Sequence, residues 1–181
     1  MSTDYIVANL TKRQYFDSGV VGGREGTSWR SILRGDSAHA LAYLLSLDQY
    51  LGYHLAHWVG DCFFLVADSD HSKVPQSLFD LRQNADESPY WTVKNTFADI
   101  SLNLIAQECT QAFMLEHYLE LASHNDEMFV HLAHIVLHLD APQIEGAFVQ
   151  QFGTNWRKRY NDLAKSWRPW YERLPMRPDV S

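Results

Sequence analysis

The stretch that decides the fold is residues 53–67, Tyr-His-Leu-Ala-His-Trp-Val-Gly-Asp-Cys-Phe-Phe-Leu-Val-Ala. Two runs rich in aromatic and apolar residues, Tyr53–Val59 and Cys62–Ala67, flank the dipeptide Gly60-Asp61. Glycine readily adopts the positive φ that a two-residue hairpin turn requires, so the pattern predicts an antiparallel β-hairpin formed by these two runs. Because both faces of this hairpin would be largely apolar, we expect protein to cover it on both sides.

The rest of the chain predicts one more hairpin followed by helices. Asp4–Asn9 and Arg13–Phe16 are short β-branched and aromatic runs, which predict a hairpin at the N-terminus. Cap residues and apolar spacing predict helices at 37–47, 90–107, 109–122, 125–139, 143–151 and 154–168. The predicted fold class is α+β, a small antiparallel β-hairpin layer near the N-terminus packed against a mainly helical C-terminal half.

Length and composition indicate one ordinary folded domain. The 181 residues are 46% apolar and 20% charged, so we expect a single domain with a hairpin-containing part at 1–70 and a helical part at 90–174. No apolar run approaches the ~20 residues that span a bilayer, and residues 1–9 lack a signal-peptide pattern, which favours a cytoplasmic protein with no membrane partner. Cys62 and Cys109 are far apart, and we expect both to be small buried hydrophobes.

The charged residues are distributed unevenly. The net charge is −7, residues 35–153 carry sixteen Asp or Glu against three Lys or Arg, and residues 154–181 carry seven basic residues against three acidic ones. This balance disfavours binding of nucleic acid over the whole surface. Either the basic end neutralises the acidic body, or the acids form a face for a basic protein partner. The candidate partner-binding residues are Glu116, Glu120, Asp126, Glu127, Arg157 and Arg159.

Three segments of the first third of the chain resemble a known family. They are Tyr5–Phe16, with the sequence Tyr-Ile-Val-Ala-Asn-Leu-Thr-Lys-Arg-Gln-Tyr-Phe, then His57–Asp61 and Val66–Asp68. They resemble a widespread family of small bacterial and phage proteins, which open with a Tyr-x-Val-Asn-Leu-Thr-Lys-like stretch and later carry Trp-Ala-Gly-Asp and Val-Gly-Asp. In this chain Val59 replaces Ala and Ala67 replaces Gly. That family has no assigned function, so the resemblance implies no activity and no site residues.

A histidine stripe is the main candidate for metal binding. Glu127, His131, His134 and His138 recur at intervals of four, three and four, so they share one face of the expected helix 125–139. With His117 from the preceding helix they would offer ligands of the type that Zn²⁺ prefers. The spacing matches neither His-Glu-x-x-His nor the Glu-x-x-His pair of di-iron bundles. A pH-sensitive or partner-binding stripe and a solvated helix face are the alternatives.

The last helix offers a third kind of site. Trp156, Tyr160 and Leu163 follow helical spacing with Arg157 and Lys158 among them, a pattern that fits core packing or stacking on nucleic-acid bases. No group of residues fits a catalytic site better than it fits ordinary core packing or an ordinary surface. We therefore expect a small acidic protein-binding module of the inhibitor or immunity type rather than an enzyme, and no required cofactor. A metal-dependent enzyme and a nucleic-acid binder are the alternatives.

Overall fold

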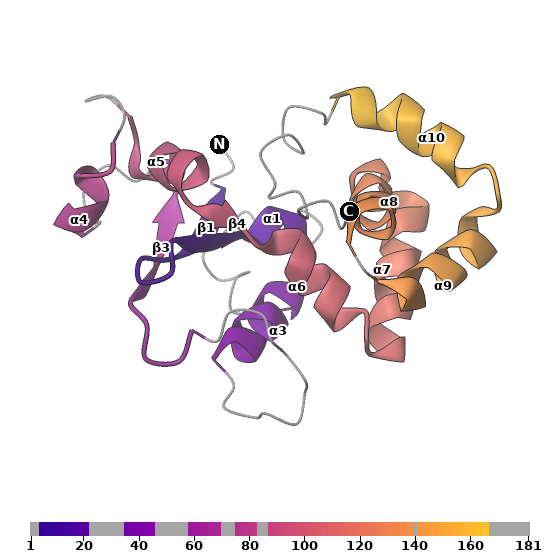
Figure 1. The fold of residues 1–181 in the computed structure, drawn as a ribbon, viewed down its shortest axis with the longest axis horizontal. Coiled ribbons are helices and arrows are strands. Elements are labelled where there is room, and N and C mark those ends of the chain that lie inside the picture. Colours follow the sequence, from indigo (N-terminus) through magenta and orange to yellow (C-terminus); the bar gives the residue numbers. More distant parts are fainter. Residues whose placement is uncertain are drawn as a thin grey trace, which may run out of the picture. The chain divides into compact units, whose positions relative to one another are not determined.

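The structure is a computed structural model that describes residues 4–21, 35–45, 58–69, 75–82, 87–139 and 141–166. The chain divides into two compact units, Met1–Ser101 and Leu102–Ser181 (Figure 1). The first contains a four-stranded sheet, and the second is helical. The α+β class is therefore confirmed. The sheet-containing unit extends to Ser101, well beyond the expected part at 1–70, while the single-domain organisation stays a prediction.

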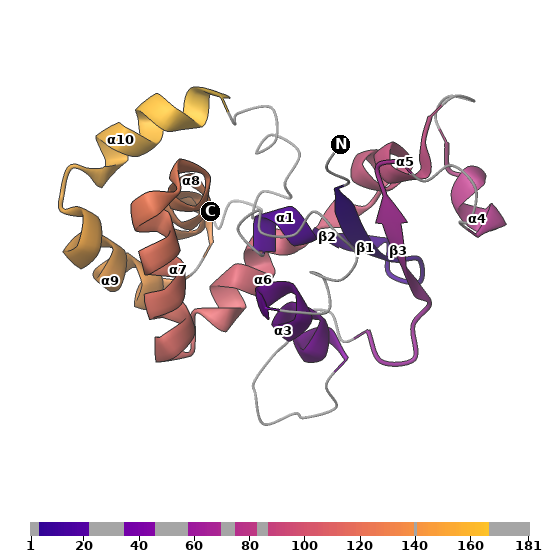
Figure 2. The ribbon, with the colours of Figure 1, turned by 180° about the vertical axis from the view of Figure 1, so that it is seen from behind.

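The N-terminal hairpin is confirmed. Strands β1 (Tyr5–Asn9) and β2 (Gln14–Asp17) pair antiparallel, with Val7 opposite Phe16 and Ala8 opposite Tyr15. Strand β3 (Phe63–Ala67) pairs antiparallel with the other edge of β1, and the short β4 (Ala98–Asp99) pairs parallel with β2. The strand order is β3-β1-β2-β4, and Figure 2 shows β2, β1 and β3 side by side.

The hairpin expected at residues 53–67 is corrected in one respect. Gly60 has the predicted positive φ, 81°, in a turn where the Asp61 amide donates to the Trp58 carbonyl at 3.0 Å. The strand after this turn, however, pairs with β1. Residues 53–57, its expected partner, lie outside the described residues. The Cys62 amide donates to Thr11 Oγ1 at 3.1 Å, which fixes the start of β3 beside the β1–β2 turn.

Helices cover both faces of the sheet. Helices α4 (Gln76–Phe79) and α5 (Pro89–Thr96) bury one face, whose apolar core contains Ile6, Ala8, Tyr15, Val66, Leu78, Tyr90, Val93 and Phe97. On the opposite face lie α1 (Ser18–Val21) and α3 (Gly35–Leu44) (Figure 1). The fully buried Trp58 packs its ring on Phe16 there. Protein thus lies on both faces of the sheet, but the expected cover over the hairpin at 53–67 is incomplete, because Val59, Phe63 and Leu65 are exposed.

The long helix expected at 90–107 is interrupted. Helix α5 ends at Thr96, Phe97 is extended, and helix α6 (Ser101–Glu108) begins after β4. Two backbone hydrogen bonds hold the extended segment against β2 and the residue before it. The Ala98 amide donates to the Arg13 carbonyl and the Ile100 amide to the Tyr15 carbonyl, both at 2.9 Å. Tertiary pairing has overridden the local helical preference here.

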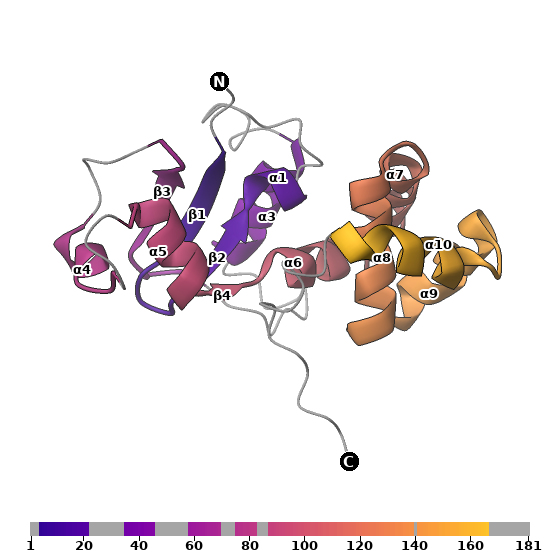
Figure 3. The same cartoon turned by 90° about the horizontal axis from the view of Figure 1, so that it is seen from above.

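The C-terminal unit is built around α8 (Asp126–His138). This helix contacts α7 (Ala112–His124), α9 (Pro142–Phe152) and α10 (Trp156–Leu163), and all residues from Met128 to Ile135 are buried (Figure 3). The Asn125 side chain caps α8 by accepting from the amides of Glu127 and Met128, whereas the sequence alone leaves Asn125 and Ser123 as alternative caps. A 3₁₀ turn, Ala164–Ser166, follows α10. Among the described helices none is long and apolar enough to cross a membrane.

Candidate functional site

Helix α10 neutralises two acids of the C-terminal unit. Arg159 forms an ion pair with Asp126 at 2.6 Å, and Arg157 lies 3.9 Å from Glu145. The Arg159 guanidinium also stacks 4.0 Å from the centre of the Phe129 ring. Two of the predicted partner-binding residues, Asp126 and Arg159, therefore interact with each other, and Arg157 also has an acidic neighbour.

The histidine stripe lies mostly inside the helical unit. His131 is 1% exposed and His134 is 7% exposed, whereas His138 is exposed and stacks on His134 with ring centres 4.3 Å apart. His134 Nδ1 lies 3.2 Å from the Tyr160 hydroxyl. The stripe is buried because α8 is the central helix, so the solvated-face alternative holds only for its end at His138.

Burial favours the neutral form of His134 and His138. It lowers the pKa of His134 to about 3, with a smaller contribution from His138, and it also lowers the pKa of His138. Glu127 Oε1 lies 3.9 Å from His131 Nε2, and His117 lies on α7 with its ring against Tyr118. Among the described residues no group of three or more His, Cys, Asp or Glu side chains is arranged to hold a metal ion. The zinc hypothesis stays a prediction.

Two acids on one face of α7 have no basic partner among the residues that the structure describes. Phe113 is 59% exposed, and Glu116 and Glu120 are exposed three and seven residues further along. At about 100° per residue these three side chains fall within about 60° of one another, so they project from the same face. Neither glutamate forms an ion pair with any residue that the structure describes. We call Phe113, Glu116 and Glu120 the α7 face.

A buried polar cluster under α5 was missed by the sequence analysis. Lys94 Nζ donates to Asp17 Oδ2 at 2.8 Å and to the Tyr90 hydroxyl at 3.2 Å. The side chains of Lys94 and Asp17 are only 13% and 12% exposed. Burial and the Asp17 charge raise the pKa of Tyr90 to about 12, and the attraction of Asp17 helps to keep the pKa of Lys94 above its ordinary value despite burial.

The cluster continues into β4 and the first residue of α6. Asp99 Oδ1 accepts hydrogen bonds from the Ser101 amide at 2.9 Å and from Ser101 Oγ at 2.6 Å, and Ser101 Oγ in turn accepts from the Asp17 amide at 2.9 Å. Asp99 is buried, which raises its pKa, and the Asp17 charge adds to this effect. We call Tyr15, Asp17, Tyr90, Lys94, Asp99 and Ser101 the buried cluster.

One sequence signal was available for this cluster. Lys94 is one of only three basic residues between positions 35 and 153, and it lies beside Val93 and four residues after Tyr90 on the apolar side of its helix. A lone lysine in that setting needs a buried acid. The acid itself, Asp17, is distant in sequence and could not be identified without the pairing of β2 with β4.

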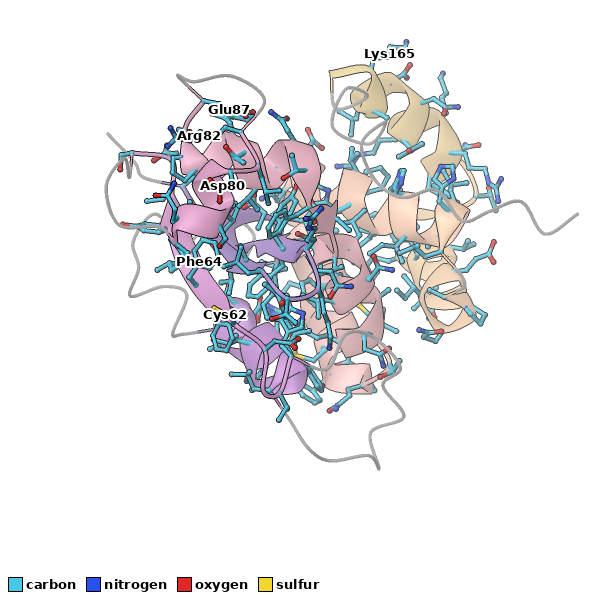
Figure 4. The ribbon with its side chains drawn as sticks, turned by 60° about the vertical axis from the view of Figure 1, so that its left-hand side comes forward. Cys62, Phe64, Asp80, Arg82, Glu87 and Lys165 are labelled. Atoms are coloured by element: carbon cyan, nitrogen blue, oxygen red, sulfur yellow. The ribbon has the colours of Figure 1, made fainter. Side chains whose placement is uncertain are left out.

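Two of the segments singled out in the sequence, Tyr5–Phe16 and His57–Asp61, meet in a structural junction. Asn9 Nδ2 donates to Asp61 Oδ2 at 2.8 Å, and Lys12 Nζ lies 3.2 Å from the same oxygen. The hydrogen bond from Asn9, followed by the contribution of Lys12, lowers the pKa of Asp61. Cys62 lies at the start of β3 (Figure 4) and is exposed, contrary to expectation, while Cys109 is buried as expected. The junction explains these motifs as turn and strand anchors.

Comparison of the chain with protein-family models, with curated proteins and with solved structures found no match.

Proposed function

We propose that the protein is a protein-binding module, of the inhibitor or immunity type, that recognises a basic partner through the α7 face. The observation that carries the proposal is the contrast between the acids of this unit. Asp126 and Glu145 have arginine neighbours on α10, and Glu127 is half-buried, whereas Glu116 and Glu120 are exposed without an ionic partner among the described residues. The predicted acidic surface is thereby narrowed to one helix face.

The α7 face defines the chemistry of its partner. The two carboxylates attract Lys or Arg side chains of a partner, and they repel acidic proteins. The exposed Phe113 ring adds an apolar contact of the kind that anchors protein interfaces. The expected partner segment therefore carries at least two basic residues next to an apolar one. Arg157 and Arg159, predicted to take part, are instead assigned to holding α10 onto α8 and α9.

Charge reversal of the face tests this proposal. The full-length protein carrying Glu116→Lys and Glu120→Lys is used as bait in a cell extract beside wild type. The matched control carries Asp80→Lys and Asp162→Lys, which change the net charge equally at exposed positions elsewhere. We expect proteins captured by wild type and by the control to be lost from the face variant, and their capture to weaken as salt rises.

A second variant separates the apolar contact from the charges. Phe113→Ser leaves both glutamates in place, so it should weaken capture without changing its salt dependence. Circular dichroism verifies that every variant is folded. Equal capture by the face variant and the control, or capture that is insensitive to salt, contradicts the proposal.

A further inference from the structure

The buried cluster has more acid than base if all its groups are ionised. Asp17 and Asp99 would carry two negative charges, and Lys94 supplies one positive charge. Lys94 Nζ is already bound to Asp17 Oδ2 and to the Tyr90 hydroxyl. A charged Asp99 would therefore be uncompensated inside the protein, where an isolated carboxylate costs several kcal/mol and takes up a proton instead.

The two carboxyl oxygens of Asp99 have different surroundings. Its Oδ1 accepts both donors of Ser101, whereas Oδ2 is buried and accepts no hydrogen bond of normal geometry from a described residue. The Tyr15 hydroxyl lies close to this carboxyl group. A proton on Oδ2 removes the charge and gives the atom a donor role beside the Tyr15 oxygen. Burial and the Asp17 charge raise the pKa of Asp99, and they outweigh the hydrogen bonds from Ser101 and Tyr15, which favour its charged form.

We propose that Asp99 carries a proton in the folded protein and acts as a pH-sensitive clasp that fastens β4 and the first residue of α6 to β2. Ser101 is the connecting member, because its hydroxyl donates to Asp99 and accepts from the Asp17 amide. Loss of the proton places a second negative charge close to Asp17. The repulsion opens the clasp and frees the segment that ends the N-terminal unit.

A catalytic role for the same groups is less well supported. Asp99 is 5% exposed and Tyr15 is 4% exposed, so a substrate cannot reach either group in this conformation. Among the described residues, the other ionisable groups that act on the cluster are Lys94 and Tyr90 of α5, together with Asp4, whose charge acts on Tyr90. None of them supplies a second positive charge for Asp99. The arrangement therefore favours a proton-dependent fastening over an acid–base centre.

Hydrogen exchange measured against pH tests the clasp. The amides of Asp17 and Ile100 donate to Ser101 Oγ and to the Tyr15 carbonyl, so their protection reports whether β4 is attached. The pKa of Asp99 is higher when β4 is attached than when it is detached. Between the ordinary pKa and this higher pKa, the attached state therefore becomes less stable as pH rises. We expect protection, corrected for intrinsic exchange, to fall by up to about tenfold for each pH unit in that interval.

Asp99→Asn supplies the matched comparison. Asparagine keeps the oxygen that accepts from Ser101 and replaces the protonated oxygen by an NH₂ donor. The protection of the Asp17 and Ile100 amides in this variant should therefore not decline with pH. Asp80→Asn, at an exposed position, should behave as wild type. Infrared difference spectra of Asp99→Asn against wild type should also show loss of a protonated carboxyl band at neutral pH. Absence of that band in wild type, or the same pH dependence in wild type and Asp99→Asn, overturns the proposal.

Discussion

Replacement of Lys94 by Met should destabilise the N-terminal unit strongly. Methionine keeps the length and the apolar part of the side chain but removes the ammonium group that lies 2.8 Å from Asp17 Oδ2. Exposed ion pairs are worth about 0.2–1 kcal/mol, whereas removal of one partner of a buried pair costs about 3–5 kcal/mol because it strands the other charge. With both side chains about one-eighth exposed, we expect a loss near ~3 kcal/mol.

A double variant of Lys94 and Asp17 distinguishes the cost of leaving the Asp17 charge unpaired from the cost of losing the contact itself. Asp17→Asn added to Lys94→Met removes the stranded carboxylate, so the double variant should lose less stability than the sum of the two single changes, by ~1–3 kcal/mol. Urea unfolding is followed through hydrogen exchange of the β1 and β2 amides, which reports on the N-terminal unit. A loss below ~1 kcal/mol for Lys94→Met, or strict additivity, would refute the description of this pair as buried and coupled.

Four other substitutions test separate parts of the fold. Gly60→Ala should cost ~1–2 kcal/mol in urea unfolding because φ is 81° there, whereas Gly146→Ala in the exposed middle of α9 should gain ~0.5–1 kcal/mol, and equal effects would contradict the assigned turn. Phe148→Ala should cost ~3–5 kcal/mol, measured by thermal unfolding, because the buried ring contacts Phe129 and Trp156. Since the folded-state pKa of His134 is about 3, the unfolded state binds an extra proton below about pH 6.5, so stability should fall between about pH 6.5 and pH 3 in wild type and fall less in His134→Phe.

The helical unit was predictable because its signals are local. Asn125 caps α8, Pro142 begins α9, and helical spacing marks the intervening segments. The position of α8 among its neighbours was not predictable, because an apolar helix that carries a histidine stripe looks the same whether the stripe is covered or solvated. Burial of His131 and His134 follows from contacts with α7, α9 and α10.

Three of the four strands and the pairing of β1 with β2 were predictable, but the pairing of β3 with β1 and the strand β4 were not. The turn at Gly60 favours pairing of β3 with the preceding segment, yet β1 pairs with it along all five residues of β3. Strand β4 was missed because Ala98 and Asp99 lie within a segment of helical spacing, and two residues are too few for a strand pattern. The buried cluster depends on that missed pairing, so local signals could not locate its acidic members.

The parallel pairing of β2 with β4 has a consequence during synthesis. The hydrogen bond between Asp17 and Ser101 joins positions 84 residues apart, and loops of that length close slowly compared with the β1–β2 hairpin. A nascent chain on the ribosome can form that hairpin early, but the far edge of β2 stays without its partner until the segment around Ser101 has emerged from the exit tunnel. Translation speed over residues 18–101 therefore sets how long an unfinished sheet edge is exposed to chaperones or to other nascent chains.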